Sequence, residues 1–566
     1  MTKPTYTAIT IGPIYKTLSL ARKTRELWGA SYLFSFIMRK IIEGLGDEQK
    51  CCLPFHSNIL KEWKDKGAGL FPDRLIYEGD VSDAIPGIEE NIIKILSDKS
   101  GLDSIYLQNY IRIYFTTYSL PLPIYKDDES IEKNYNIIMV ANKLLDALEL
   151  KGKYYSGNIS GIDWKKAIDN LNGKQFYTEA FQNSKKFEFP SIAEIATFDF
   201  YDYKPEAYEA LVKQHITLQE EKDQSDFLNA LKNSTEFGDK LKLRTYHKYI
   251  AVVQGDGDNI GKTIQAIGGD KKMVQKFSSA LFDFALAATD EIKKYGGKAV
   301  YVGGDDVLFF APVAVFNENL NEGNGGLSSI FGLLSALDQK FEKYLINHPD
   351  LKELYKEGGK LHGNVPSMSY GVSITYSKYP LNEARDTAYA LLQKAKSIKD
   401  DKNKICFKLH KHSGHSFGFT VNKKEKNGGK PPLSYNYFIK MVTNIPLTEG
   451  LLLSISTKLA PLHVLLKEIG SDKPRLNPFF EQEFEYEKLE KTINNNSLPA
   501  SVREEAKSQL TFIKSIEEFY HQLCVDFKEH NLPFPTNATE ASDSNIAKLY
   551  STLRFIKHLT DEEDEQ

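Results

Sequence analysis

Two short apolar runs near the middle of the chain are separated by a turn made only of glycine and aspartate. The segment 301–310 reads YVGGDDVLFF. Apolar runs of this length are typical of strands in a buried sheet, and glycine and aspartate are typical of the tight turn between paired strands. The pattern therefore predicts a buried β-hairpin whose tip carries two adjacent carboxylates, Asp305 and Asp306.

The hydrophobic pattern on either side of this hairpin predicts further elements of one sheet. A strand, an amphipathic helix, the hairpin, another strand, a second amphipathic helix and a closing strand are expected over residues 249–253, 273–295, 301–310, 367–375, 384–398 and 405–409. We interpret this order as a β-α-β-β-α-β, ferredoxin-like arrangement. In it, the end of the first strand lies beside the hairpin, so Asp256 is expected to meet Asp305 and Asp306.

Three carboxylates brought together in this way predict a metal site. Like charges at short range cannot all stay ionised without a compensating cation, and Mg²⁺ suits an all-oxygen site that also takes substrate phosphates. Two such ions can activate a 3′-hydroxyl and steady a leaving pyrophosphate. Lys396, late on the second helix, is a candidate cation for the triphosphate, and Ser369 is a candidate hydrogen-bonding group for a base or ribose.

These motifs also allow two plainer interpretations. Glycine and aspartate are common turn residues, so a hairpin with this tip can be purely structural. The segment 261–263, Gly-Lys-Thr, resembles the end of a P-loop, but that motif needs a glycine five residues before Gly261, where this chain has Asp256. The P-loop is therefore rejected.

The motifs together resemble the palm of diguanylate cyclases and their relatives. The form with two aspartates is similar to the large polymerase/cyclase subunit of type III CRISPR effector complexes, in the Cmr (III-B) group. The segments that carry this resemblance are the 303–306 turn, the Asp256 motif, 388–396 and 377–381 in the second half of the chain, and 9–14, 21–33 and 70–74 near the N-terminus.

The resemblance implies two palm domains that face each other and hold two ATP molecules. It implies Mg²⁺ or Mn²⁺, as two ions, on Asp256, Asp305 and Asp306. The nucleotide-facing positions that we expect are Gly257, Asp258, Asn259, Gly303, Gly304, Ser369 and Lys396 in the second palm and Ser31 in the first.

The activity that the resemblance implies is the synthesis of a cyclic oligoadenylate with 3′–5′ linkages. Production is expected when target RNA pairs with a guide CRISPR RNA held by a complex of several protein subunits. A second possibility is that the same site joins AMP from ATP to S-adenosylmethionine. A diguanylate-cyclase-like enzyme and a non-catalytic RNA-binding scaffold also remain open.

The chain departs from many members of that family in two ways. No His-Asp dipeptide occurs in the sequence, so we expect no HD-type DNA cleavage. The four cysteines form no C-x-x-C pair, so we predict no zinc knuckle. Three histidines at 410, 412 and 415 lack cysteine or acidic partners at ligand spacing, which favours a basic loop near RNA or a partner over a metal cluster.

The whole chain is expected to have an α+β fold, with two ferredoxin-like palms and two helical domains. The expected domains are 1–125 for the first palm, 126–244 for a helical inter-palm domain, 245–421 for the second palm and 433–560 for a C-terminal helical domain. In the first palm, strands are expected over 6–11 and 105–115.

Composition adds limits on the location and partners of the chain. A net charge of −4 argues against a free-standing nucleic-acid binder and is compatible with a subunit that shares its RNA contacts. Four scattered cysteines, no signal peptide and no long apolar run favour a cytoplasmic protein without a membrane span.

Overall fold

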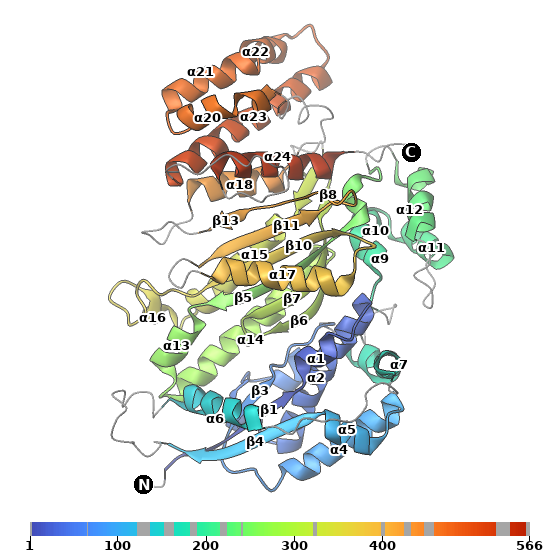
Figure 1. Ribbon diagram of the computed structural model, residues 1–566, viewed down its shortest axis with the longest axis vertical. Helices are drawn as coiled ribbons and strands as arrows, with labels where there is room; N and C mark the ends of the chain where they lie inside the picture. The colour runs from blue at the N-terminus through green and yellow to red at the C-terminus, as the bar shows by residue number, and fades with distance from the viewer. Residues whose placement is uncertain are drawn as a thin grey trace.

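The computed structural model shows two sheets and several groups of helices arranged along one long axis (Figure 1). The residues that it describes are 3–64, 66–120, 136–151, 163–181, 189–215, 224–238, 241–320, 325–397, 402–423, 432–445, 455, 458–527 and 544–561.

The N-terminal part forms a four-stranded antiparallel sheet in the order β2-β3-β1-β4. Its elements are β1 (Thr5–Gly12), α1 (Ile14–Leu18), α2 (Thr24–Leu45), β2 (Cys51–Leu53), α3 (Ile59–Glu62), β3 (Arg74–Glu78), α4 (Ile85–Ser100), α5 (Ser104–Tyr110) and β4 (Arg112–Ser119). This strand order is that of a ferredoxin-like fold, so the prediction of a first palm is confirmed.

The middle of the chain forms the larger sheet, in the order β12-β11-β10-β5-β7-β6, with β13 also paired to β11. Its elements are β5 (Tyr249–Asp258), α13 (Ile260–Ile267), α14 (Lys271–Lys294), β6 (Lys298–Gly303), β7 (Asp306–Pro312), α15 (Ile330–Phe341), α16 (Lys352–Tyr355), β10 (Ser367–Tyr376), α17 (Leu381–Lys396), β11 (Lys404–His410), β12 (Ser416–Phe417) and β13 (Thr420–Asn422). A small ribbon of β8 (Ala314–Asn317) and β9 (Gly326–Ser329) stands apart.

Two helices cover opposite faces of this sheet. Tyr370 of β10 donates a hydrogen bond to Asp338 of α15, 3.1 Å away. Its neighbour Gly371 points the other way, where a Cβ would lie 2.1 Å from the Ala388 carbonyl oxygen of α17. The ferredoxin-like core is therefore β5-α14-β6-β7-α15-β10. The predicted second helix, α17, and the closing strand, β11, extend that core instead of completing it, and β11 runs parallel to β10.

One predicted strand is wrong in part. Residues 104–110 form helix α5, and strand β4 begins only at Arg112. The Asp103 carboxylate accepts a hydrogen bond from the Ile105 backbone N–H at 2.7 Å and so caps the helix. The alternating pattern that suggested a strand belongs to its second half, which pairs with β1.

The two palms are joined directly through an edge of the larger sheet. Gly69 of the first palm donates its backbone N–H to the Val300 carbonyl at 3.3 Å and accepts from Val302 N–H at 2.8 Å. Beside this bridge, Phe282 of α14 packs against the rings of His56 and Phe71. The edge strand β6 is thus covered by the first palm rather than by solvent.

The helices between the two palms in the sequence do not pack together as one domain. They are α6 (Ile137–Lys151), α7 (Trp164–Leu171), α8 (Tyr177–Ala180), α9 (Ile192–Ala196), α10 (Phe198–Tyr203), α11 (Pro205–His215) and α12 (Gln224–Asn233). Helix α6 packs on the Tyr6 and Ala8 face of the first sheet, whereas α9 and α10 lie against the second palm.

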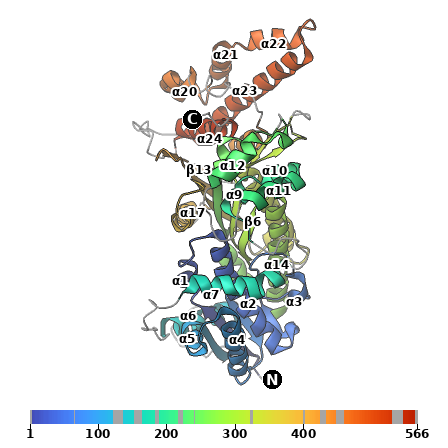
Figure 2. The same ribbon diagram turned by 90° about the vertical axis from the view of Figure 1, so that its right-hand side faces the viewer.

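C-terminal helices form the far end of the molecule in both views (Figures 1 and 2). They are α18 (Leu433–Thr443), α20 (His463–Ile469), α21 (Lys473–Glu483), α22 (Tyr486–Asn494), α23 (Ala500–Asp526) and α24 (Asn545–Thr560). No helix among the described residues is long and apolar enough to cross a membrane. The predicted domain boundaries remain predictions.

Candidate active site

The Gly-Gly-Asp-Asp turn joins β6 to β7 as the sequence predicted. Gly304 has a φ of 66°, a left-handed conformation that glycine adopts without strain. A Cβ built on Gly304 would meet no atom within 4 Å, so the tip of the turn is open. Asp305 is partly exposed and Asp306 is exposed, and both carboxylates belong to the turn that faces the first palm.

Asp256 and Lys396 both reach this turn. In β5, Gly255 pairs with Val307 of β7, which places Asp256 one residue further along, beside the turn. The Lys396 ammonium, at the end of α17, donates hydrogen bonds to the Asp256 carboxylate and, at 3.0 Å, to the Gly257 carbonyl. The structure therefore brings together the acidic and basic residues that the sequence singled out.

Gly257 is needed because the chain here touches the turn. A Cβ on Gly257 would lie 2.7 Å from both Cβ and Oδ2 of Asp305, closer than real side-chain atoms approach. The absence of a side chain at this position lets β5 carry Asp256 against Asp305. This contact shows that residues 256–257 and 305 are neighbours.

The electrostatics of the site reflect this crowding. Burial, together with the negative charge of Asp256, raises the pKa of Asp305 to about 7, and Lys396 opposes the shift. Burial by surrounding protein and the charges of Asp305 and Asp256 also raise the pKa of Asp306, although its side chain keeps contact with solvent. Lys396 alone does not neutralise three acids, so the site favours an added cation.

The all-oxygen donor set fits Mg²⁺ or Mn²⁺. Among the described residues, no group of three or more His, Cys, Asp or Glu side chains stands ready to hold a metal ion. Mg²⁺ sites at phosphates commonly use only one or two carboxylates, with water and phosphate oxygens as the other ligands. Asp305 and Asp306 meet that requirement, and ligation by all three aspartates remains a prediction.

Two of the predicted nucleotide-facing residues are internal to the protein. Asp258 is fully buried, and its Oδ2 accepts hydrogen bonds from Ser369 at 2.7 Å, from Ser367 at 3.0 Å and from the Asn403 backbone at 2.9 Å. Ser369 is also fully buried. The expectation that Ser369 faces a base or ribose is therefore corrected: its hydroxyl is committed to a buried carboxylate next to the site.

Asn259 and Ser31 support the surroundings of the turn. Asn259 has a φ of 60° and donates a hydrogen bond to the Val365 carbonyl at 3.3 Å, so it shapes the entry to α13. Ser31 is 6% exposed, and its Oγ lies 3.4 Å from a Cβ built on Gly69. Ser31 is thus close to the inter-palm bridge, but Gly69 stands between it and the second palm.

Two residues near the turn were not singled out from the sequence. Tyr301 lies inside the motif, and its ring covers Gly303. Asp73 belongs to the first palm, and its negative charge helps to raise the pKa of Asp306 and of Tyr301 in the second palm. Its backbone carbonyl accepts from Ile11 N–H at 3.0 Å, which fixes its position at the start of β3. No sequence pattern indicates that the charge of Asp73 acts on Asp306, because only the docking of the palms brings the two residues near each other.

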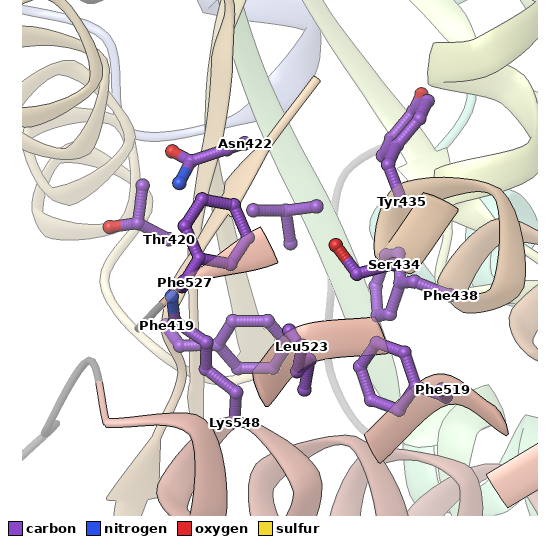
Figure 3. Close-up of a pocket in the computed structure, with 11 residues that line it drawn as sticks. Phe419, Thr420, Asn422, Ser434, Tyr435, Phe438, Phe519, Leu523, Phe527 and Lys548 are labelled. Carbon is purple, nitrogen blue, oxygen red and sulfur yellow. The ribbon is translucent and has the colours of Figure 1, made fainter. Parts of the chain in front are cut away.

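A separate pocket lies where β13 packs against the C-terminal helices (Figure 3). It is lined by Phe419, Thr420, Val421, Asn422, Ser434, Tyr435, Phe438, Phe519, Leu523, Phe527 and Lys548, which come from β13 and the C-terminal helices. Its volume of about 10 Å³ suffices for one water molecule and excludes a nucleotide. The pocket does not compete with the carboxylate site as a nucleotide-binding site.

Comparison with known proteins gives two family matches along the chain. Residues 249–406 match the second palm domain of Cas10/Cmr2, and residues 6–78 match the N-terminal region of the CRISPR-associated protein Cmr2. The first match includes Asp256, the acidic turn and Lys396. The second match covers β1 to β3 of the first palm.

Individual relatives agree with these matches. The Cmr subunit Cmr2 of Pyrococcus furiosus is 24% identical over 283 residues, which cover 44% of this chain and 28% of that protein. The chain thus spans little more than a quarter of the length of this curated relative.

One solved structure with a similar chain is a type III-B Cmr-beta complex in the apo state. Its sequence identity is 12% and its TM-score is 0.48, and the match covers 99% of this chain and 82% of that chain. Another is a Csm1–Csm4 cassette in complex with pppApA, with 10% identity, a TM-score of 0.45, and 91% and 69% covered. The two family models match in chain order and fall on the two ferredoxin-like sheets, so the chain is similar to Cas10/Cmr2 proteins over residues 6–78 and 249–406.

Proposed function

We propose that the second palm is a metal-dependent nucleotidyltransferase site that uses ATP, in a subunit of a type III-B CRISPR effector complex. The observation that carries this proposal is the convergence of Asp256, Asp305 and Lys396 at an open acidic turn. Such a site can bind a triphosphate together with its metal ions. Phosphoryl transfer depends mainly on positioning and charge neutralisation, so these residues need to supply little else.

The reaction forms one bond and breaks another at the α-phosphorus. The 3′-oxygen of an acceptor bonds to that phosphorus, the bond to the β-phosphate oxygen breaks, and pyrophosphate leaves with the electron pair. Mg²⁺ or Mn²⁺ held by Asp305 and Asp306 would neutralise the phosphate charge and lower the pKa of the attacking hydroxyl. The hydroxyl proton passes to a carboxylate of the turn and from there to water.

Lys396 has a defined part in this scheme. In the structure its ammonium is paired with Asp256 and the Gly257 carbonyl. A triphosphate offers stronger acceptors, so Lys396 is expected to exchange Asp256 for phosphate oxygens when ATP binds. The exchange would free the Asp256 carboxylate for a metal ion.

The proposed product is a cyclic oligoadenylate with 3′–5′ linkages, made when target RNA pairs with the guide. Support comes from the family matches and from similar Csm1–Csm4 cassettes, whose solved structures are complexes with pppApA, cA3 and cA4. Transfer of AMP to S-adenosylmethionine uses the same attack at the α-phosphorus and stays an alternative acceptor reaction.

The test is product analysis of the assembled complex with guide and target RNA. Mass spectrometry after incubation with ATP, with ATP plus S-adenosylmethionine, and with GTP alone distinguishes oligoadenylate, AMP conjugate and cyclic diguanylate. The double variant Asp305→Asn/Asp306→Asn should make none of these. Asp350→Asn, at an exposed position paired with Lys276, is the matched control and should retain full activity. A double variant with unchanged products would leave the scaffold interpretation standing.

A further inference from the structure

Tyr301 is held between the two palms by two glycines. On one side, a Cβ built on Gly69 of the first palm would lie 3.5 Å from Cδ2 of the Tyr301 ring. On the other side, a Cβ built on Gly303 would lie 2.1 Å from the Tyr301 hydroxyl oxygen and 2.3 Å from Cζ. Any side chain at position 303 would therefore displace the ring, so the ring position depends on this glycine.

The backbone around Tyr301 is fixed from both palms. Val300 is an extra residue in the β6–β7 pairing, because Ala299 pairs with Phe309 and Tyr301 with the next residue, Leu308. Bulges of this kind redirect side chains and are common beside active sites. The Val300 carbonyl accepts from Gly69.

The first palm holds Gly69 rigidly on its own side. Ser35 of α2 accepts hydrogen bonds from the Leu70 and Phe71 backbone N–H groups at 2.9 Å and 2.8 Å, which fixes the segment that follows Gly69. The Tyr301 ring is therefore positioned by both palms and not by β6 alone.

The Tyr301 hydroxyl lies next to the acidic turn. Among the described residues, none forms a hydrogen bond with it, although the hydroxyl lies over Gly303, at the base of the acidic turn. The negative charges of Asp73 in the first palm and of Asp306 and Asp305 in the second act on it. Lys396 is paired with Asp256, and Asp256 is followed by Gly257, which contacts Asp305. The hydroxyl thus lies over the base of the acidic turn, and Gly69 of the first palm contacts the same ring.

We propose that Tyr301 is a substrate-positioning residue, whose phenol hydroxyl hydrogen-bonds the ribose hydroxyls of the acceptor nucleotide between the palms. This inference rests on the proposed nucleotidyl transfer and assigns the acceptor side of the same site. A phenol both donates and accepts, so it matches a ribose hydroxyl, which does the same.

The test combines a protein change with a ligand change. Tyr301→Phe removes only the hydroxyl and keeps the ring between Gly69 and Gly303. Binding of a non-hydrolysable ATP analogue and of its 2′-deoxy and 3′-deoxy forms is measured by calorimetry on the assembled complex with both nucleotide sites filled. Loss of one neutral hydrogen bond should weaken the acceptor-site affinity for the ribo form by about threefold to tenfold. At least one deoxy form should bind wild type and Tyr301→Phe equally.

Control variants separate this role from a structural one. Tyr295→Phe removes another hydroxyl, which donates to the Ser328 carbonyl at 2.9 Å away from the turn, and should leave every nucleotide affinity unchanged. Equal weakening of the ribo and both deoxy forms by Tyr301→Phe, or no weakening at all, would overturn the inference. Failure of the proposed function is seen separately, as unchanged products in Asp305→Asn/Asp306→Asn.

Discussion

At the scale of single residues, ionisation of Asp305 in the acidic turn is unfavourable because the carboxyl is buried beside other carboxylates. A bound cation would make the ionised form more favourable. Asp305 has its pKa raised from 3.8 to about 7 by burial and by Asp256. The folded protein therefore binds more protons at this residue than the unfolded chain does between those two pH values. The contribution of Asp305 to the free energy of unfolding is therefore greatest below about pH 4, and it is lost as the pH rises towards 7.

Replacing Asp305 with Asn should therefore stabilise the free protein, and more so at high pH. Between pH 5 and pH 8.5 the advantage of Asp305→Asn over wild type should grow by about 1–3 kcal/mol, since each unit of pKa shift corresponds to about 1.4 kcal/mol. Urea unfolding at the two pH values measures it. Asp350→Asn is the control, because a hydrogen bond from Lys276 lowers the Asp350 pKa and its charge stays constant over this range. An advantage that shrinks with pH would contradict the charge assignment.

The hydrogen-bond partner of Ser369 could not be predicted from the sequence. The residue type and its strand were predicted, but its hydroxyl turns to buried Asp258 and not to a ligand. Ser369→Ala should destabilise the protein by about 1–3 kcal/mol, because a buried carboxylate loses a donor, and should leave the KM for ATP unchanged. Ser367→Ala removes the more exposed donor and should cost less. A raised KM with normal stability would restore the ligand-binding role.

At the scale of elements, the position of α17 decides where Lys396 lies. This helix crosses β10 at Gly371, where a Cβ would lie 2.1 Å from the Ala388 carbonyl and 2.3 Å from the Leu392 nitrogen. Close helix–strand approach therefore needs glycine at this position. The contact sets the distance from the helix to the sheet and, through it, the reach of Lys396 to Asp256.

Gly371→Ala should push α17 away from the sheet and uncouple Lys396 from the turn. We expect a lower urea midpoint and product formation reduced by at least tenfold, because a small misplacement of a positioning group has a large effect on rate. Gly87→Ala, in α4, is the matched control, since a Cβ there meets no atom within 4 Å and alanine favours helix. Normal activity in Gly371→Ala would show that the helix position is not critical.

The elements themselves could be predicted where hydrophobic periodicity was strong. The hairpin 301–310, the helix 273–295 and the strand 249–253 all appear, because each has a long apolar face buried in one core. The helix over 104–110 was missed because a local cap, not periodicity, starts it. The role of α15 as the second core helix was missed, and the helix over 384–398 was expected in its place. Which helix packs into the core is decided by tertiary packing, which one sequence does not show.

At the scale of the whole molecule, the candidate active site depends on the docking of the two palms. Phe282 of the second palm packs against His56 and Phe71 of the first, with ring centroids 5.1 Å and 6.4 Å away. Phe282→Ala should lower the stability by about 3–5 kcal/mol if the cavity stays open, and should reduce product formation as the palms loosen. Lys66→Ala breaks an exposed ion pair with Asp290 in the same interface and should change stability by less than about 1 kcal/mol. Equal effects of the two changes would contradict a packed interface.

The most direct measurement is to locate Mn²⁺ by anomalous scattering in crystals of the protein with a non-hydrolysable ATP analogue. The account predicts Mn²⁺ between the carboxylate oxygens of residues 305 and 306 and the nucleotide phosphates, with the Lys396 ammonium moved onto the phosphates. Asp305→Asn/Asp306→Asn should lose that signal. Nucleotide bound elsewhere, or an ordered triphosphate at the turn without any Mn²⁺, would contradict the account.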